Sequence, residues 1–121
     1  MRLYALRGAI TVERNDAEAI LSATERLVRA ILERNDLEPA ALVSCIFTAT
    51  EDLDAEFPAV AARRVGLTGT PLLCARELPV PGALPRVIRV LVHYYADDGH
   101  QSQHVYLGEA HTLRSDLDDA Q

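Results

Sequence analysis

The sequence predicts an α+β domain: a mixed β-sheet of about five strands, with one long helix and one short helix on a mostly one-sided sheet. Three observations lead to this prediction. Apolar runs rich in β-branched residues are separated by polar turns, one longer segment repeats its apolar residues with a period of about 3.6, and the length of 121 residues suits one compact core. Apolar residues make up 49% and charged residues 25%, as is typical of globular proteins. We therefore expect one domain over residues 1–121, ending in a frayed polar tail at 115–121.

The first third of the chain predicts a strand followed by the long helix. Residues 2–9 are apolar on both faces and predict the first strand. Asn15 is expected to cap the helix, because Glu18 three residues later completes a capping-box pattern. Asn35 is a plausible helix end. The apolar face of the helix consists of Ile20, Thr24, Leu27, Val28, Ile31 and Leu32.

The middle of the chain predicts a strand, a short helix and another strand. Residues 42–50 form an apolar run that indicates a buried strand, and residues 51–57 are acidic and irregular. Proline suits the first turn of a helix and glycine its end, so the short helix is expected over 58–64, before Gly66. Residues 70–76 predict the next strand, which a Pro- and Gly-containing segment closes.

The last third contains the strongest strand signal. Residues 86–95 are long, β-branched and aromatic, and the Asp-Asp-Gly sequence at 97–99 marks a turn after them. Residues 103–113 predict one or two short final strands.

The charge balance excludes several classes of partner. All twelve cations are arginines against eighteen acidic residues, which gives a net charge of −6. An acidic chain without a basic run is a poor candidate for binding nucleic acid or anionic membranes. No apolar stretch reaches the roughly 18 residues of a membrane span, and arginines interrupt the apolar start of the chain, unlike a signal peptide. We therefore expect a cytoplasmic protein with neither nucleic acid nor membrane as a partner.

Cysteine and histidine spacing predicts no disulfide, no metal and no nucleotide cofactor. Cys45 and Cys74 form no CxxC pair. The sequence contains no HExxH, GxGxxG or GxxxxGK[ST] motif, so zinc-protease and phosphate-binding chemistry lack support. Surface or structural roles are expected for the four histidines, which are His93, His100, His104 and His111.

An arginine in the middle of an apolar strand is the most informative position. Strand alternation places Arg89 on one face with Val87 and Leu91, and an unpaired cation there has a steep desolvation cost. Two explanations remain open, namely an internal salt bridge to a residue such as Glu77 or an anionic ligand. Arg7 repeats the pattern in the first strand, where an exposed edge charge is the alternative.

Cys74 and Glu77 would lie on opposite faces of a regular strand, and share a pocket only if the strand bends or ends near Arg76.

Three chemistries can be compared with these residues. The sequence has no nucleophile-elbow motif of a Ser/His/Asp hydrolase and no local signature of a Cys/His site. Several arginines with one glutamate suit a small polyanionic substrate, bound by bidentate ion pairs and reacting without a protein nucleophile.

Six blocks, in order, resemble the monofunctional AroH-type chorismate mutase family. The opening block is similar to RGATTVE(R/K)(N/D), and the others to ATxDLxAxFPA, CxxEMxV, IRV, HVYL and LRPDL. These blocks occupy Leu6–Asp16, Thr48–Ala59, Cys74–Val80, Ile88–Leu91, His104–Leu107 and Leu113–Leu117. The resemblance runs from about residue 2 to residue 117.

The resemblance implies a trimeric pseudo-barrel, with sheets packed in the middle, helices outside, and active sites between subunits. It implies the Claisen rearrangement of chorismate to prephenate in aromatic amino acid biosynthesis, without metal, cofactor or covalent intermediate. By the same resemblance, Arg89 is the catalytic cation at the substrate ether oxygen, and Glu77 accepts a hydrogen bond from the substrate hydroxyl. Arg7 and Tyr106 would bind a carboxylate.

Further substrate-binding residues follow from the resemblance. Cys74 would line the pocket and Phe57 would form an apolar wall. Near the entrance of a neighbouring subunit's site would lie Arg63, Leu113 and Arg114. The chain departs from the family at three positions: Leu73 stands in place of a threonine, Leu78 in place of a methionine and Ser115 in place of a proline. With leucine at position 73, a hydroxyl contact to the substrate would be lost.

Two rival functions belong to other classes. One is a trimeric protein that binds a carboxylated metabolite without converting it, and the other is an imine deaminase of the RidA type. Loss of chorismate absorbance on adding the protein would separate the mutase from both rivals.

Overall fold

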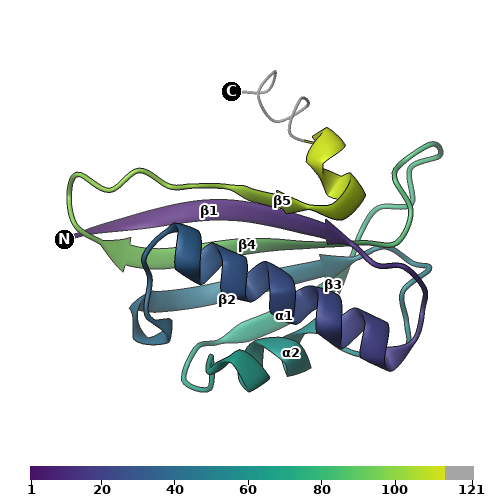
Figure 1. Cartoon of the computed structure of the whole chain (residues 1–121), viewed down its shortest axis with the longest axis horizontal. Coiled ribbons are helices and arrows are strands. Elements are labelled where there is room, and N and C mark those ends of the chain that lie inside the picture. Colours follow the sequence, from purple (N-terminus) through teal and green to yellow (C-terminus); the bar gives the residue numbers. More distant parts are fainter. Residues whose placement is uncertain (114–121) are drawn as a thin grey trace.

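The computed structural model describes residues 1–113, and one five-stranded sheet organises them (Figure 1). Arg114 and the expected tail at 115–121 lie outside the described residues. Along the chain the elements are β1 (Arg2–Thr11), α1 (Ala17–Arg34), the 3₁₀ helix η1 (Pro39–Ala41), β2 (Leu42–Ala49), α2 (Pro58–Val65), β3 (Leu72–Arg76), β4 (Val87–Ala96), β5 (Val105–Leu107) and the 3₁₀ helix η2 (Gly108–Thr112). The predicted α+β class, with a mixed sheet and one long and one short α-helix, is confirmed.

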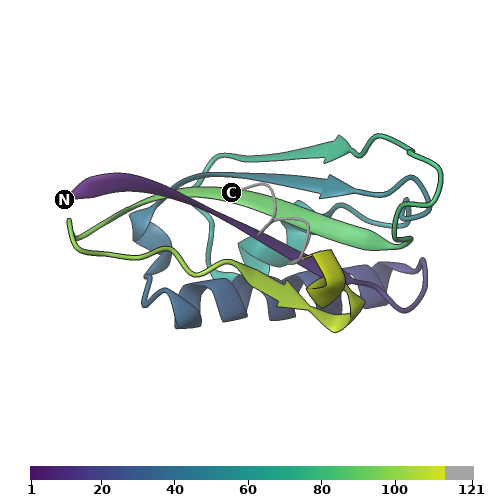
Figure 2. The same cartoon turned by 90° about the horizontal axis from the view of Figure 1, so that it is seen from above.

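The strand order in the sheet is β3-β2-β4-β1-β5. β4 runs antiparallel to both β1 and β2, while β3 is parallel to β2 and β5 is parallel to β1. Figure 2 shows α1 and α2 together on one side of this sheet. The sheet therefore has one covered face and one face without an α-helix over it within residues 1–113.

The core lies between the sheet and the two α-helices. It is formed by alternate residues of the strands and by the apolar stripe of α1, as period-two and helical patterning require. Gly8 lets α1 approach β1, because a Cβ atom there would lie 3.0 Å from Ile31 Cδ1 and 3.2 Å from Leu27 Cδ1. The most deeply buried side chains of this core include Leu6, Ile10, Ile20, Leu27, Ile31, Phe47, Ile88 and Tyr94.

The other face of the sheet, called the open face below, carries both apolar and charged residues. Its central strand alternates between buried residues toward the helices and more accessible residues at Arg89, Leu91, His93 and Tyr95. The register adds Arg7 opposite Leu91, and then Ile46, Thr48 and Leu73 from the neighbouring strands. Large apolar side chains exposed on strands β1, β3 and β4 include Leu3, Leu73 and Tyr95.

The predicted cap of the long helix was wrong. Asp16, not Asn15, occupies the N-cap position, and its carboxylate accepts a hydrogen bond from the Ala19 backbone N–H at 2.7 Å. Both residue types cap helices well, so local sequence does not separate them. The predicted helix end at Asn35 is confirmed.

The predicted final strands over 103–113 were correct only for three residues. β5 ends at Leu107, and Gly108 then adopts a φ of 62°, which starts the 3₁₀ helix η2. A Cβ atom at Gly108 would lie 2.5 Å from Thr11 Oγ1. This oxygen accepts a hydrogen bond from the Glu109 N–H at 3.0 Å, so η2 is fastened to the end of β1.

None of the helices in residues 1–113 combines the length and apolar character that crossing a membrane requires.

Candidate active site

Arg89 lies in the middle of β4 on the open face and is joined to Glu77 by one hydrogen bond. Its Nε donates to Glu77 Oε1 at 3.0 Å, while the hydroxyl of Thr48 donates to Glu77 Oε2 at 2.9 Å. The Arg89 side chain is 41% exposed and that of Glu77 is 15% exposed. The internal salt bridge considered for Arg89 therefore exists, and part of the guanidinium still faces outward.

Glu77 follows β3 directly and continues its alternation, which places it on the same face as Leu73, Ala75 and Arg89. The Glu77 backbone N–H donates to the carbonyl of Ala49 at 3.0 Å, which keeps the chain beside β2. The carboxylate then contacts Thr48 and Arg89, which are cross-strand neighbours in the sheet. Glu77 thus lies on the open face, opposite to Cys74, as strand alternation predicts.

Arg7 and Tyr106 line one cavity together with Arg89 and Thr48. The cavity has a volume of about 290 Å³ on the open face. Ala9 lies opposite Arg89 on one side and Tyr106 on the other in the strand register, so its small side chain leaves room between them. We call Arg7, Thr48, Glu77, Arg89 and Tyr106 the arginine half-site. Two cations against one carboxylate make it suited to an anionic ligand.

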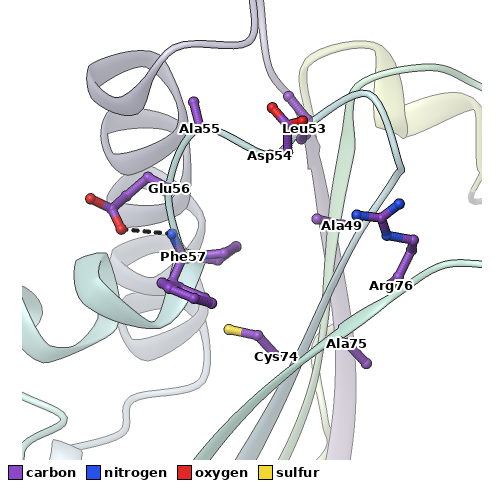
Figure 3. A pocket seen from close by; sticks show the side chains of 10 residues that line it. Ala49, Leu53, Asp54, Ala55, Glu56, Phe57, Cys74, Ala75 and Arg76 are labelled. Atoms are coloured by element: carbon purple, nitrogen blue, oxygen red, sulfur yellow. Dashed lines mark hydrogen bonds between the residues drawn. The ribbon is translucent and has the colours of Figure 1, made fainter.

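A second cavity, of about 330 Å³, lies on the helix side of β3 (Figure 3). Figure 3 shows the Cys74 sulfur pointing toward Phe57, which is 68% exposed. Cys74 pairs with Phe47, a buried residue of the helix-side core, so its side chain lies on the sheet face opposite to that of Arg89. We call the cavity the Phe57 pocket; its lining also includes Ala49, Leu53, Asp54, Ala55, Glu56, Pro58, Ala75 and Arg76.

The loop that carries Phe57 is held by Asn15. The Asn15 side-chain oxygen accepts hydrogen bonds from the N–H groups of Asp54 and Ala55 at 3.0 and 3.2 Å. Its amide nitrogen donates to Asp54 Oδ1 at 2.8 Å. Pro58 then begins α2, and Gly66, at a φ of 115°, ends it as predicted. Asn15 therefore positions the apolar wall instead of capping α1.

Three further predicted site residues, which are Arg63, Leu73 and Leu113, lie outside both cavities. Arg63 is exposed on α2, and Leu113 packs beside Ala110 after η2; neither lines the arginine half-site cavity or the Phe57 pocket. Leu73 is 61% exposed on the open face and lies beside Ile46. Arg114 lies outside the described residues.

Cys45 and the four histidines hold structural positions. Burial raises the pKa of the Cys45 thiol to about 12, which makes it unsuited to nucleophilic chemistry. Each histidine forms a hydrogen bond: His93 with Ser44, His100 with Tyr94, His104 with the Arg7 N–H and His111 with the Gly108 carbonyl. Residues 1–113 contain no group of three or more His, Cys, Asp or Glu side chains that could hold a metal ion.

The family model for chorismate mutase type I matches residues 3–117 of the chain. The chain belongs to this family. It is 52% identical over 118 residues to the chorismate mutase AroH of Thermus thermophilus, which covers 96% of this chain and 97% of that protein. It is 40% identical over 119 residues to the chorismate mutase AroH of Bacillus subtilis (strain 168), covering 97% and 94%. The resemblance found in the six sequence blocks is thereby confirmed.

A solved structure agrees with the family and with the fold. A chorismate mutase from Clostridium thermocellum superposes with a TM-score of 0.87 at 46% sequence identity, covering 91% of this chain and 99% of that one.

Sequence reasoning missed three residues that the structure places at the candidate site of this chorismate mutase family member. Thr48 bonds Glu77, Asn15 holds the Phe57 loop, and Arg76 lines the Phe57 pocket. Thr48 carried a weak signal as a hydroxyl residue in an apolar strand, but its pairing directly opposite Arg89 is visible only in the structure. Asn15 carried none beyond its capping propensity.

Proposed function

We propose that this chain is a chorismate mutase that converts chorismate to prephenate as a homotrimer, in the cytoplasm and in aromatic amino acid biosynthesis. The observation that carries the proposal is the arginine half-site, in which Arg89 keeps an outward-facing guanidinium beside Arg7 and Glu77. The family membership of the chain supports the same reaction.

The reaction sets two physical requirements. Chorismate carries two carboxylates, a hydroxyl and an ether oxygen, and its two ends must be held in a compact diaxial shape before a bond can form between them. Holding that conformer removes much of the entropic cost of the step. As the C–O bond breaks, partial negative charge develops on the ether oxygen, and a fixed cation there lowers the barrier.

Arg89 is the residue that we assign to the ether oxygen. Its Nε is bound to Glu77, which restricts the orientation of the guanidinium, and no Nη atom of Arg89 forms a hydrogen bond with residues 1–113. Donors that are already oriented need no reorganisation when the charge appears. The rearrangement is intramolecular, so no protein nucleophile takes part.

The other polar residues hold the ends of the substrate. Glu77 accepts a hydrogen bond from the substrate hydroxyl, and Arg7 and Tyr106 bind a carboxylate. Arg7 lines the Arg89 cavity and forms no ion pair with another residue of 1–113, which leaves its guanidinium available for a bidentate contact.

The apolar half of the site is proposed to come from a neighbouring copy of the chain. Phe57 and Cys74 lie on the helix side of the sheet, whereas Arg89 lies on the open face, so one chain does not bring them into one cavity. The exposed apolar residues Leu3 and Leu73 also give the open face a surface that assembly would bury. Arg63, Leu73, Leu113 and Arg114 are proposed to contact substrate in that assembly.

The direct test is a spectrophotometric assay with purified protein and chorismate. A mutase decreases the chorismate absorbance and produces prephenate. Binding without loss of absorbance would support the metabolite-binding rival, and activity on an imine with none on chorismate would support the deaminase rival.

A mixed assembly tests the location of the site between chains. Arg89→Lys disables the arginine half-site and Phe57→Asp places a carboxylate in the apolar wall, so each variant alone should lose most of its activity. When the two variants are co-expressed in equal amounts, a shared site is intact only if its arginine half comes from the Phe57→Asp chain and its apolar half from the Arg89→Lys chain. Random assembly gives this combination in about one site in four, so about a quarter of wild-type turnover should return. Activity no greater than the sum of the two variants would contradict shared sites, and sedimentation equilibrium showing a monomer would contradict the trimer.

A further inference from the structure

Glu77 uses its two oxygens on two different partners. Oε1 accepts from Arg89 Nε at 3.0 Å and Oε2 accepts from the Thr48 hydroxyl at 2.9 Å. Arginine and carboxylate frequently pair through two parallel hydrogen bonds instead, because the guanidinium fork matches the two carboxylate oxygens. The single bond observed here therefore needs an explanation.

The position of Thr48 provides one. Thr48 and Arg89 are cross-strand neighbours on the open face, and Glu77 comes in beside them from the end of β3. The β-branched side chain of Thr48 has few rotamers in a strand, so its hydroxyl is held in place beside Glu77 Oε2. By bonding Oε2, Thr48 directs this oxygen toward its own hydroxyl on β2, and Glu77 forms a single hydrogen bond with Arg89.

The consequence concerns the donors of Arg89. A two-bond pair would occupy one Nη group as well as Nε, and would rotate the guanidinium toward Glu77. We infer that Thr48 is a positioning residue, which keeps the Glu77–Arg89 pair at a single bond and so leaves the Arg89 Nη donors free for the ether oxygen. The effect of Thr48 on kcat rests on the proposed mutase reaction, whereas its effect on the geometry of the Glu77–Arg89 pair does not depend on that reaction.

The test compares Thr48→Val, which keeps the branched shape and removes the hydroxyl, with Thr48→Ser, which keeps the hydroxyl. The charge on the ether oxygen develops only in the transition state, so Thr48→Val should lower kcat roughly tenfold and change KM by less than about twofold. Thr48→Ser should retain kcat within about twofold of wild type. Thr48→Ala provides a second removal of the hydroxyl if the valine variant folds poorly.

A double-variant experiment separates positioning from a general structural role. If Thr48 acts through Glu77, adding Thr48→Val to Glu77→Ala should change kcat no further, since the group that Thr48 holds is absent. Equal losses of kcat from Thr48→Val in the two backgrounds would overturn the inference. So would equal losses from Thr48→Val and Thr48→Ser.

A structural readout distinguishes failure of this inference from failure of the proposed function. A crystal structure of Thr48→Val should show both Glu77 oxygens on the Arg89 guanidinium. The single bond persisting in that variant would overturn the inference even if the wild type converts chorismate. If the wild type does not convert chorismate, the proposed function fails, and the change in the Glu77–Arg89 pair still decides the role of Thr48.

Discussion

The arginine half-site and the Phe57 pocket are built in different ways. Arg7, Thr48 and Arg89 project from paired strands, and Glu77 joins Thr48 and Arg89 through direct side-chain hydrogen bonds. The Phe57 wall instead belongs to the loop before α2, which Asn15 holds from outside. The charged groups that we assign to the developing charge thus stand on paired strands, whereas the proposed apolar wall stands on a loop. The following predictions test that difference.

The largest effect should come from Arg89→Lys. A lysine ammonium is a point charge without the planar fork, so it cannot bind Glu77 and present further donors in one fixed plane. We expect kcat to fall by roughly 10²–10³ while circular dichroism and Tm stay near those of the wild type. The matched control is Arg29→Lys on the exposed side of α1, which should leave kcat unchanged. Near-normal turnover of Arg89→Lys would refute its assignment.

A thiol reagent should distinguish the two cysteines. Cys74 lines the Phe57 pocket, whereas Cys45 is buried with a pKa raised to about 12. At pH 8 very little of the Cys45 thiol is ionised, so we expect it to react more than roughly tenfold more slowly than Cys74. The measurement is the time course of labelling by a chromogenic disulfide reagent. Cys74→Ser should remove the fast phase, and a fast phase that persists would contradict the burial of Cys45.

Asn15→Ala should affect the Phe57 pocket more than the arginine half-site. The change removes three hydrogen bonds to the loop at Asp54 and Ala55. We expect KM to rise a few-fold with kcat nearly unchanged, and the free energy of unfolding to fall by about 1 kcal/mol. Ser22→Ala on the exposed side of α1 is the control. A loss confined to kcat would show that the loop affects the arginine half-site instead.

The smallest effect should come from the helix cap at Asp16. The Ala19 N–H, together with Arg14, lowers the pKa of the Asp16 carboxyl below its ordinary value. A lowered folded-state pKa stabilises the fold above the unfolded-state pKa, and that stability is lost as the pH falls through the folded-state value. Asp16→Asn can still cap the helix but does not titrate. Its Tm should lie slightly below that of wild type at pH 7, and the difference should shrink below about pH 4. A difference that is constant with pH would contradict this charge effect.

Much of the fold could be predicted because its signals are local. The apolar period of α1, the proline and glycine around α2 and the β-branched run of β4 depend on residues close together in the chain. The failures involve distant partners. Asn15 binds a loop 39 residues away, and β5 ends before η2 where Gly108 packs closely against Thr11. Neither contact leaves a trace in the neighbouring sequence.

The same distinction between local signals and contacts of distant residues applies to the candidate site. The sequence predicted Arg7 and Arg89 as site residues because a charge in an apolar strand is costly without a partner, and it predicted Glu77 and Tyr106 from the blocks that resemble one family. Only the tertiary structure showed that Glu77 joins Arg89 on the open face while Cys74 lies on the other. The physical reason is that strand alternation gives relative faces within a strand, but the pairing of β3 with β2 and the side on which the helices pack decide which face each side chain reaches.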